Sequence, residues 1–371
     1  MSILTRRTFL TATAAGAATY ALFARSRGVT MPPGVVWTDV ADWPIEGRAF
    51  KERAAPYDRL PARAEGEVRA KVWELSRQSA GMIARFQTKS PGLWVRYRLT
   101  SDRLAMPHMP ATGVSGLDLY SHDGDGWRWV AVTRPSQRDV SARMFVNQPT
   151  EAARSFQLYL PLYNGVEKLE LGVPEGFGLQ PMPRRSQVNK PIVCYGTSIM
   201  HGACSSRPGM AWTSIMGRQL DREVLNFGFS GNGRMELEVG QYLAELEPAA
   251  FVVDCLPNMN PKMVAQRTQP LVRQLRSARP DTPILLVEDR TFTNAWFHKP
   301  RLAEHQKRRQ ALRGAFTALE ADGIKGLHLL AGDGLLGADG EAATDGSHPS
   351  DLGMLRQANA VTAALRPLIS S

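Results

Sequence analysis

Cysteine is scarce in this chain of 371 residues, which contains only Cys194, Cys204 and Cys255. An odd number of thiols cannot all pair, so the sequence lacks the cysteine framework of a small disulfide-rich domain. Cys194 and Cys255 stand in apolar runs, where a free thiol packs as a small hydrophobic group. No Cys or His residues show the spacing of a metal motif. We therefore expect packing roles for the cysteines, and neither a metal nor a cofactor.

Long hydrophobic runs and acidic residues are also few. An uncharged stretch at residues 9–24 is rich in Ala and Thr and is short for a membrane span. Lys and Arg number 45 against 35 Asp and Glu, and the formal charge is +10. Four of the excess positive charges are arginines in residues 1–28, and no nucleic-acid-binding motif accompanies the remainder. We interpret the charge as solvated basic surface rather than as a nucleic-acid interface.

The start of the chain is typical of an export signal. Residues 5–10, Thr-Arg-Arg-Thr-Phe-Leu, resemble the twin-arginine signal, and the apolar stretch follows directly. We predict that residues 1–28 are a signal segment, that the twin-arginine translocase is a partner, and that the protein is periplasmic or secreted. No clean small-x-small cleavage site lies near Ala24, so an uncleaved membrane anchor is the alternative.

Residues 29–179 have the pattern of an all-β domain. Short runs that alternate polar and apolar residues, or are rich in β-formers, are separated by turn signals such as Asp-Gly-Asp-Gly at 123–126. The predicted strands lie at residues 93–99, 117–120, 127–132, 156–160 and 169–173. Few helical patterns intervene, so we predict a β-sandwich. Residues 180–189, in a stretch rich in Gly and Pro, are the predicted linker.

Residues 190–371 change to a βα pattern, in which apolar runs alternate with helical stretches. The runs lie at residues 191–195, 223–227, 249–256, 283–287 and 326–331. This repetition predicts five parallel strands with crossover helices, a three-layer α/β/α domain that is flavodoxin-like in outline. In such domains ligands bind beyond the carboxyl ends of the strands.

Polar residues that suit acyl chemistry follow these strands. Ser198 comes just after the first run, and Asp345 and His348 stand three apart in a loop of Gly, Ser and Pro. A serine hydroxyl is a poor nucleophile unless a base takes its proton and a carboxylate orients that base. Asp345 and His348 can point into one cleft together, with His348 reaching Ser198. His201 is an alternative base, although its place three residues after Ser198 would point it away from the attacking face; a capping serine is the alternative role for Ser198.

The order of these loops resembles that of the SGNH (GDSL) hydrolase family over residues 189–368. The resemblance implies that Ser198 is the nucleophile, His348 the base and Asp345 its orienter. It further implies an oxyanion hole made by the backbone N–H groups of Ser198 and Gly231 and the side-chain amide of Asn258. The sequence departs from the family motifs at Thr197 and Ile199, and again around Asn258, where Leu-Pro-Asn-Met stands for Gly-x-Asn-Asp. A competing Gly-x-Ser-x-Gly elbow would require glycine at Met200.

Residues 116–120, Gly-Leu-Asp-Leu-Tyr, resemble the signature of an N-terminal domain that is fused to one SGNH subgroup and is similar to carbohydrate-binding modules. We interpret Asp118 by itself as an exposed or capping strand residue. The two resemblances imply an exported serine esterase that hydrolyses short acyl esters, such as acetyl esters, on a carbohydrate through an acyl-serine. One alternative is an acyltransferase that uses a sugar or natural-product hydroxyl. The other is a non-catalytic carbohydrate-binding protein.

Two further expectations concern less regular parts of the chain. Residues 106–114 hold two Met and two Pro and are more apolar than a solvated loop. We predict that this segment packs against the catalytic domain near Ser198, the alternative being a fold back over its own sandwich. His298 and His305 lie in or near a basic helical stretch, and we expect both to be solvated.

Overall fold

The computed structural model describes residues 33–369, which form two antiparallel sheets and one parallel sheet. The predicted export signal at residues 1–28 lies outside the described residues. Within residues 33–369, no helix is both long enough and apolar enough to cross a membrane.

The two antiparallel sheets come from the first half of the chain. The first has the order β1 (Val35–Asp39), β8 (Val166–Pro174), β3 (Leu93–Leu99) and β6 (Asp139–Phe145). The second has the order β5 (Trp127–Val132), β4 (Asp118–His122), β7 (Arg154–Tyr159), β2 (Ile83–Thr88) and β9 (Gln180–Pro181). One hydrophobic core joins them and includes Phe86, Val95, Leu119 and Leu171. The predicted β-sandwich is confirmed.

The parallel sheet comes from the second half. Its order is β11 (Val224–Gly228), β10 (Ile192–Gly196), β12 (Ala250–Asp254), β13 (Ile284–Val287) and β14 (Leu327–Leu330). Each strand lies where an apolar run predicted it, apart from shifts of a residue or so at the ends. β10 is therefore the second strand from one edge, with β11 and β12 as its parallel neighbours.

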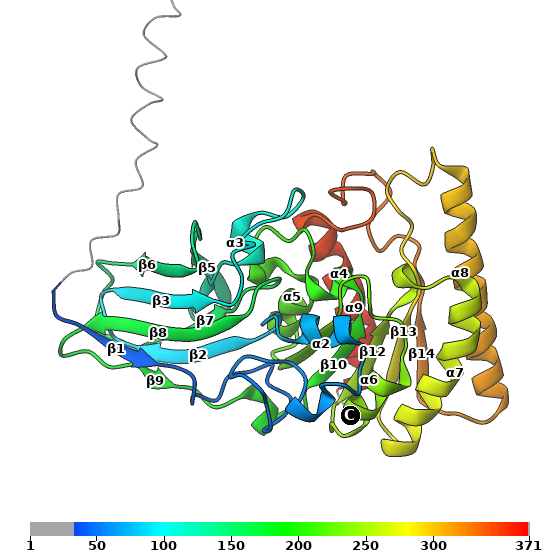
Figure 1. Cartoon of the computed structure of the whole chain (residues 1–371), viewed down its shortest axis with the longest axis horizontal. Helices are drawn as coiled ribbons and strands as arrows, with labels where there is room; N and C mark the ends of the chain where they lie inside the picture. The colour runs from blue at the N-terminus through cyan, green and yellow to red at the C-terminus, as the bar shows by residue number, and fades with distance from the viewer. Residues whose placement is uncertain (1–32, 370–371) are drawn as a thin grey trace, which may run out of the picture.

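Helices cover both faces of this sheet. Alternate residues of β10 face opposite sides: Cys194 shares a core with α5 (Trp212–Gln219) and α9 (Asp351–Ile369), whereas Tyr195 belongs to the core on the other face. That second core is formed with α6 (Leu237–Ala244), α7 (Pro261–Ala278) and α8 (Lys299–Ala321). Figure 1 shows α7 and α8 at one end of the molecule and the sandwich at the other. The predicted three-layer α/β/α domain is confirmed.

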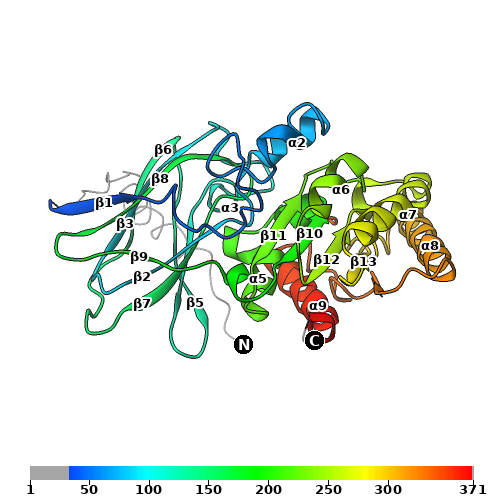
Figure 2. The ribbon, with the colours of Figure 1, turned by 90° about the horizontal axis from the view of Figure 1, so that it is seen from below.

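An early segment of the chain completes the α/β half. The 3₁₀ turn η1 (Ala62–Ala64) and the helix α2 (Ala70–Ser76) precede most of the sandwich strands in sequence. Their buried side chains, including Val72 and Leu75, nevertheless belong to the core of the parallel sheet together with Phe227. Figure 2 shows α2 over the junction of the two halves, beside α6. The two halves therefore share a hydrophobic core.

A buried ion pair and a buried arginine add to this junction. Arg185 lies in the predicted linker, in the turn η2 (Arg185–Gln187), and its guanidinium Nη2 is 2.6 Å from Glu46 Oε2, with both side chains buried. Burial raises the pKa of Glu46, but the Arg185 charge and its hydrogen bonds outweigh burial and hold that pKa below its usual value. Arg59 is also buried, and it donates to the carbonyl oxygens of Asn226 and Gly228 at 3.1 and 2.7 Å. These contacts fix the sandwich half against the end of β11.

Candidate active site

Ser198 stands where β10 gives way to the short helix α4 (Ser198–His201). The Thr197 hydroxyl caps this helix by accepting a hydrogen bond from the Ile199 N–H at 3.3 Å. Thr197 therefore has the capping role that the alternative interpretation gave to Ser198. The Ser198 side chain, in a residue that is only 8% exposed, is left for another partner.

That partner is His348. Its Nε2 lies 2.8 Å from Ser198 Oγ, and its Nδ1 lies 2.7 Å from Asp345 Oδ2. The other Asp345 oxygen accepts the backbone N–H groups of Ser347 and His348 at 3.0 and 2.8 Å. Burial raises the pKa of Asp345, but the hydrogen bonds from His348 and Ser347 outweigh burial and lower that pKa to about 2. An ionised Asp345 accepts the Nδ1–H, so the Nε2 lone pair faces the serine hydroxyl, as base-assisted attack requires.

The loops that carry Gly231 and Asn258 surround the same end of β10. Gly196, the last residue of β10, pairs in register with the last residues of β11 and β12. Gly231 has φ +69°, and at nearby Gly233 a side-chain carbon would lie 1.8 Å from the Gly196 carbonyl oxygen, so this loop is pressed onto the end of β10. The two predicted loops therefore meet at the edge of the sheet where Ser198 begins its helix.

The side-chain amide of Asn258 is a hydrogen-bond donor that has no acceptor within residues 33–369. Asn258 ends the turn η4 (Leu256–Asn258), and its Nδ2 is buried without a partner among residues 33–369. A buried donor left unpaired is costly, and a site that awaits an oxyanion explains why it is kept. Ser198 opens the helix α4, and the first N–H groups of a helix have no intrahelical acceptor, so its N–H can serve as a second donor. The oxyanion-hole assignment of Ser198, Gly231 and Asn258 stays a prediction.

Other titratable residues near the parallel sheet serve the structure. His201 is buried, its Nε2 is 2.7 Å from the Leu162 carbonyl oxygen, and its ring stacks on Tyr163 with centroids 4.2 Å apart. Burial, and then the charge of Arg59, hold its pKa well below the usual value. His201 thus contacts the sandwich half rather than Ser198, and the alternative assignment of His201 as base is wrong.

The expectation that His305 is solvated is also wrong. His305 is buried in α8, and its Nδ1 lies 2.6 Å from Asp289 Oδ2. The helix turns this side chain toward the sheet, and Asp289 meets it just after the end of β13. Helical periodicity could have placed His305 on the inner face of the helix, but nothing in the sequence around it indicates Asp289 as its partner. His298, in contrast, is exposed as expected.

The sandwich half reaches the active site through residues 106–114. Met109 is buried in a small core with Cys204, and the Thr112 hydroxyl donates to the Ser206 carbonyl oxygen at 2.6 Å. The ring of His108 lies 5.8 Å from the ring of His348, centroid to centroid. The prediction that this segment packs against the catalytic half near Ser198 is confirmed.

Asp118 anchors a second contact between the halves. It is fully buried, and its Oδ2 lies 2.9 Å from Arg207 Nη1 and 2.8 Å from the Gly209 N–H. Its Oδ1 accepts the Trp129 indole N–H at 2.9 Å. The interpretation of Asp118 as an exposed or capping residue is therefore wrong, because this end of β4 faces the catalytic half. The only signal in the sequence was the Gly-Leu-Asp-Leu-Tyr pattern itself.

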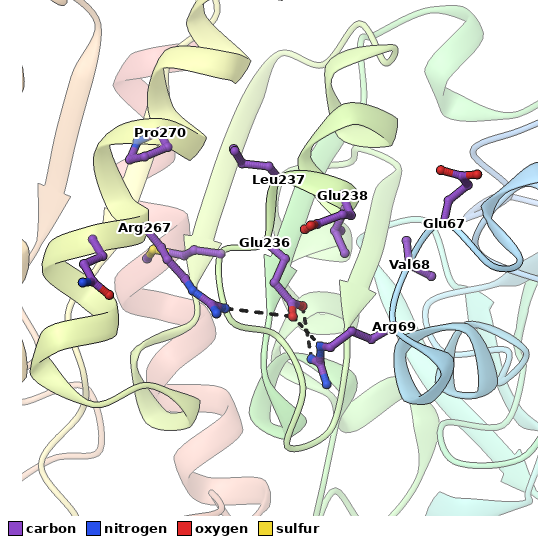
Figure 3. Close-up of a pocket in the computed structure, with 11 residues that line it drawn as sticks. Glu67, Val68, Arg69, Glu236, Leu237, Glu238, Arg267 and Pro270 are labelled. Carbon is purple, nitrogen blue, oxygen red and sulfur yellow. Dashed lines mark hydrogen bonds and ion pairs between the residues drawn. The ribbon is translucent and has the colours of Figure 1, made fainter.

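Arg69 is a residue of the site region that sequence reasoning missed. It donates to the Asn232 side-chain and backbone oxygens at 2.7 and 3.0 Å, and it pairs with Glu236, which lies 4.0 Å from Arg267 on the other side. Figure 3 shows the three charged side chains in a pocket of about 420 Å³. Arg69 thus ties the sandwich half to the residue after Gly231. No member of the serine–histidine–aspartate chain lines the pocket.

Comparison with known proteins agrees with this geometry. The family model of GDSL-like lipases and acylhydrolases matches residues 189–366, and that of the N-terminus of SGNH-hydrolase-type esterases matches residues 35–179. A crystal structure of a GDSL-like lipase from Bacteroides ovatus is 30% identical with a TM-score of 0.86, and the match covers 91% of this chain and 98% of that one. The chain belongs to the GDSL-like lipase/acylhydrolase family. This GDSL-like protein is accordingly a serine esterase in its catalytic architecture.

Two other solved structures share the fold of this GDSL-like esterase at low sequence identity. A salicylyl-acyltransferase from a tetracycline biosynthetic pathway is 18% identical with a TM-score of 0.72, covering 92% of this chain and all (100%) of that one. An acetyl xylan esterase from Butyrivibrio proteoclasticus is 11% identical with a TM-score of 0.57, covering 90% and 99%. No curated protein matches the chain.

Proposed function

We propose that this protein is an exported esterase that removes short acyl groups, acetyl above all, from a carbohydrate. The observation that carries the esterase part is the hydrogen-bonded chain from Ser198 through His348 to Asp345. Export is supported by the twin-arginine pattern at residues 5–10.

The geometry supports acyl transfer through a covalent acyl-serine. Ser198 Oγ attacks the ester carbonyl while His348 Nε2 takes its proton, and the ionised Asp345 stabilises the imidazolium that forms. The tetrahedral oxyanion then accepts hydrogen bonds from the predicted oxyanion-hole donors. Collapse expels the alcohol, which receives the proton from His348. Water, activated by the same His348, attacks the acyl-serine and releases the carboxylic acid.

A carbohydrate substrate is supported by an exposed aromatic pair beside the catalytic loop. Trp296 and Phe297 are 72% and 69% exposed, and their rings meet edge to face at 5.6 Å. The segment that carries them is bound to the catalytic loop, because the Thr293 N–H donates to the Gly346 carbonyl oxygen at 3.0 Å. Exposed apolar patches of this kind mark ligand surfaces, and aromatic rings stack on the C–H faces of sugars. The fold shared with an acetyl xylan esterase agrees with this choice.

A panel of substrates tests the proposal. The full chain is assayed for acid release from p-nitrophenyl esters of increasing acyl length and from acetylated oligosaccharides, with Ser198→Ala as the blank. We expect acetate release above the blank, and a rate that falls as the acyl chain lengthens. A purified, folded protein that binds glycans but matches the blank on every ester would favour the non-catalytic carbohydrate-binding alternative.

The acyltransferase alternative has one specific support, the likeness in fold to a salicylyl-acyltransferase over both halves of the chain. An added sugar or alcohol acceptor would then divert the acyl group from water to a new ester. Product analysis by mass spectrometry distinguishes the outcomes: free acid alone supports the hydrolase, and acylated acceptor as the main product supports the transferase.

The export part has its own test. Replacing Arg6 and Arg7 together by lysine is expected to leave an active enzyme inside the cytoplasm, because the translocase reads the arginine pair. Activity is measured in separated cell fractions. Unchanged activity outside the inner membrane would contradict the twin-arginine assignment.

A further inference from the structure

Three potential metal ligands that are far apart in the sequence meet at the rim of the active site. The side-chain donor atoms of His108, Cys204 and His348 all lie within 4.8 Å of one another. It is the one such group of His, Cys, Asp and Glu donors in the part of the chain that the structure describes. His108 comes from the sandwich half, Cys204 from the loop after α4, and His348 from the catalytic loop. Sequence spacing could not reveal the cluster, because no two of its members are neighbours.

The donor set suits a zinc ion. Zn²⁺ binds histidine nitrogen at about 2.0–2.1 Å and cysteine sulfur at about 2.3 Å, so tetrahedral ligand atoms stand about 3.4–3.6 Å apart. The three donors must therefore approach one another by at most about 1.4 Å. The side chain of His108 is exposed, so it can supply this movement. Cys204 is held in place, since it is buried and packs with Met109. Three protein ligands would leave the fourth position to water.

The surroundings of His348 also favour zinc binding. Histidines that bind zinc nearly always donate their second ring N–H to a carboxylate or carbonyl, which fixes the ring and strengthens the donor nitrogen. Asp345 already does this, with its Oδ2 2.7 Å from His348 Nδ1. Its other ring nitrogen, Nε2, is not bound by the carboxylate and lies 2.8 Å from Ser198 Oγ.

We propose that His108, Cys204 and His348 bind Zn²⁺ and that this binding switches off the esterase. The lone pair of His348 Nε2 accepts the Ser198 proton during catalysis, and a metal ion would occupy that same lone pair. Binding and catalysis therefore exclude each other. The Cys204 thiol releases its proton to solvent as the metal–sulfur bond forms, and no electrons are transferred. The inhibitory part rests on the proposed esterase reaction, but the binding site does not.

Inhibition is tested on the purified full chain in buffers of fixed free Zn²⁺. We expect the hydrolysis of p-nitrophenyl acetate to fall as Zn²⁺ rises and to recover after chelation. In His108→Ala and in Cys204→Ser, the Zn²⁺ concentration for half-inhibition, measured relative to each variant's own metal-free rate, should rise by about tenfold or more. The exposed His298→Ala variant is the matched control and should behave as the wild type. Equal half-inhibition concentrations in all four proteins would overturn the proposal.

Binding is tested separately by Cd²⁺, whose bond to a thiolate gives a charge-transfer band in the near ultraviolet. We expect the band in the wild type and in Ser198→Ala, and its loss in Cys204→Ser. Because Ser198→Ala has no turnover, this readout stands even if the protein proves not to be an esterase. Absence of the band in the wild type would overturn the metal site. A normal band without inhibition by Zn²⁺ would overturn the switch.

Discussion

Asp345 and His348 form one carboxylate–imidazole pair at 2.7 Å, and Asp289 and His305 form another at 2.6 Å. Both lie on the α/β half, and in both the carboxylate faces Nδ1. The first pair is part-exposed, and its Nε2 meets a serine hydroxyl at 2.8 Å. The second is buried, and its Nε2 has no hydrogen-bond partner within residues 33–369.

The second pair is built to hold the structure together. Asp289 Oδ2 also lies 2.9 Å from Arg308 Nη1, and the ring of Phe292 packs edge to face against His305. Burial raises the pKa of Asp289, but the His305 hydrogen bond and the nearby cationic charges outweigh burial and lower it. Of the two aspartate–histidine pairs, only Asp345–His348 has its second nitrogen within reach of a hydroxyl, as the predicted catalytic base requires.

The largest contrast is expected on removing the imidazoles. His348→Ala should lower kcat by roughly 10⁴- to 10⁶-fold, and Ser198→Ala by a similar factor, because the two act as one unit. The double variant should be no slower than either single one. His305→Ala should instead keep a kcat near the wild type and lower the melting temperature by several degrees. Steady-state rates and thermal melts measure the two effects, and additive losses at Ser198 and His348 would contradict the assignment.

The next contrast concerns the carboxylates. Asp345→Asn should lower kcat by about 10⁴-fold, since an amide beside Nδ1 favours the wrong imidazole tautomer. Asp289→Asn should leave kcat nearly unchanged and reduce stability, because the charged partner of Arg308 is lost. Rates at substrate saturation on the folded variants decide the matter. A nearly wild-type Asp345→Asn would move the orienting role to another residue.

A smaller contrast is expected in acid stability. The folded-state pKa values of Asp289 and Asp345 are both below the usual value of 3.8, so each carboxylate stabilises the fold above that value, and the stabilisation is lost as the pH falls toward the folded pKa. Asp345 is partly exposed, and solvent screens its contribution. The free energy of unfolding should therefore fall less between pH 6 and pH 3 in Asp289→Asn than in the wild type, whereas Asp345→Asn should stay close to the wild-type slope. Urea denaturation at each pH tests this, and parallel slopes for all three proteins would contradict it.

The smallest expected effect concerns the exposed rim of the Asp345–His348 pair. Trp296→Ala should raise KM several-fold for an acetylated oligosaccharide and leave KM for p-nitrophenyl acetate unchanged, because only the larger substrate reaches the aromatic ring. Leu237→Ala, at another exposed apolar residue on α6, is the control. If Trp296→Ala and the control have equal KM values for the oligosaccharide, the aromatic pair does not contact the substrate.

The features that could be predicted from the sequence are those that depend only on residues close together in the chain. Apolar runs located all five parallel strands, because a buried strand needs a continuous apolar segment. The Asp345–His348 spacing was readable for the same reason, since both residues lie on one loop. Features that depend on distant partners were not readable: Asp118 meets Arg207 only across the junction, and His305 meets Asp289 only after α8 packs on the sheet.

A local rule also failed where tertiary packing outweighs it. Pro270 predicts a kink or a split in the helix that begins near Pro261. The split is wrong, because α7 runs unbroken from Pro261 to Ala278, and the kink stays a prediction. Val264, Leu271 and Leu275 on its inner face are buried in the core of the parallel sheet, and this packing is worth more than the single backbone hydrogen bond that proline removes. Pro270 therefore removes one backbone hydrogen bond of the helix without ending it.

The packing of α2 onto the parallel sheet sets an order of events during synthesis. Leu75 leaves the ribosome 118 residues before Val193, with which it shares a core. At about 5–20 residues per second this interval lasts roughly 6–24 s, during which the apolar face of α2 has no sheet to cover. The nascent chain must hold this segment open, with its flanking sandwich strands already made, until β10 and β11 emerge. The first half of the polypeptide thus finishes folding only after the first strands of the second half have been translated.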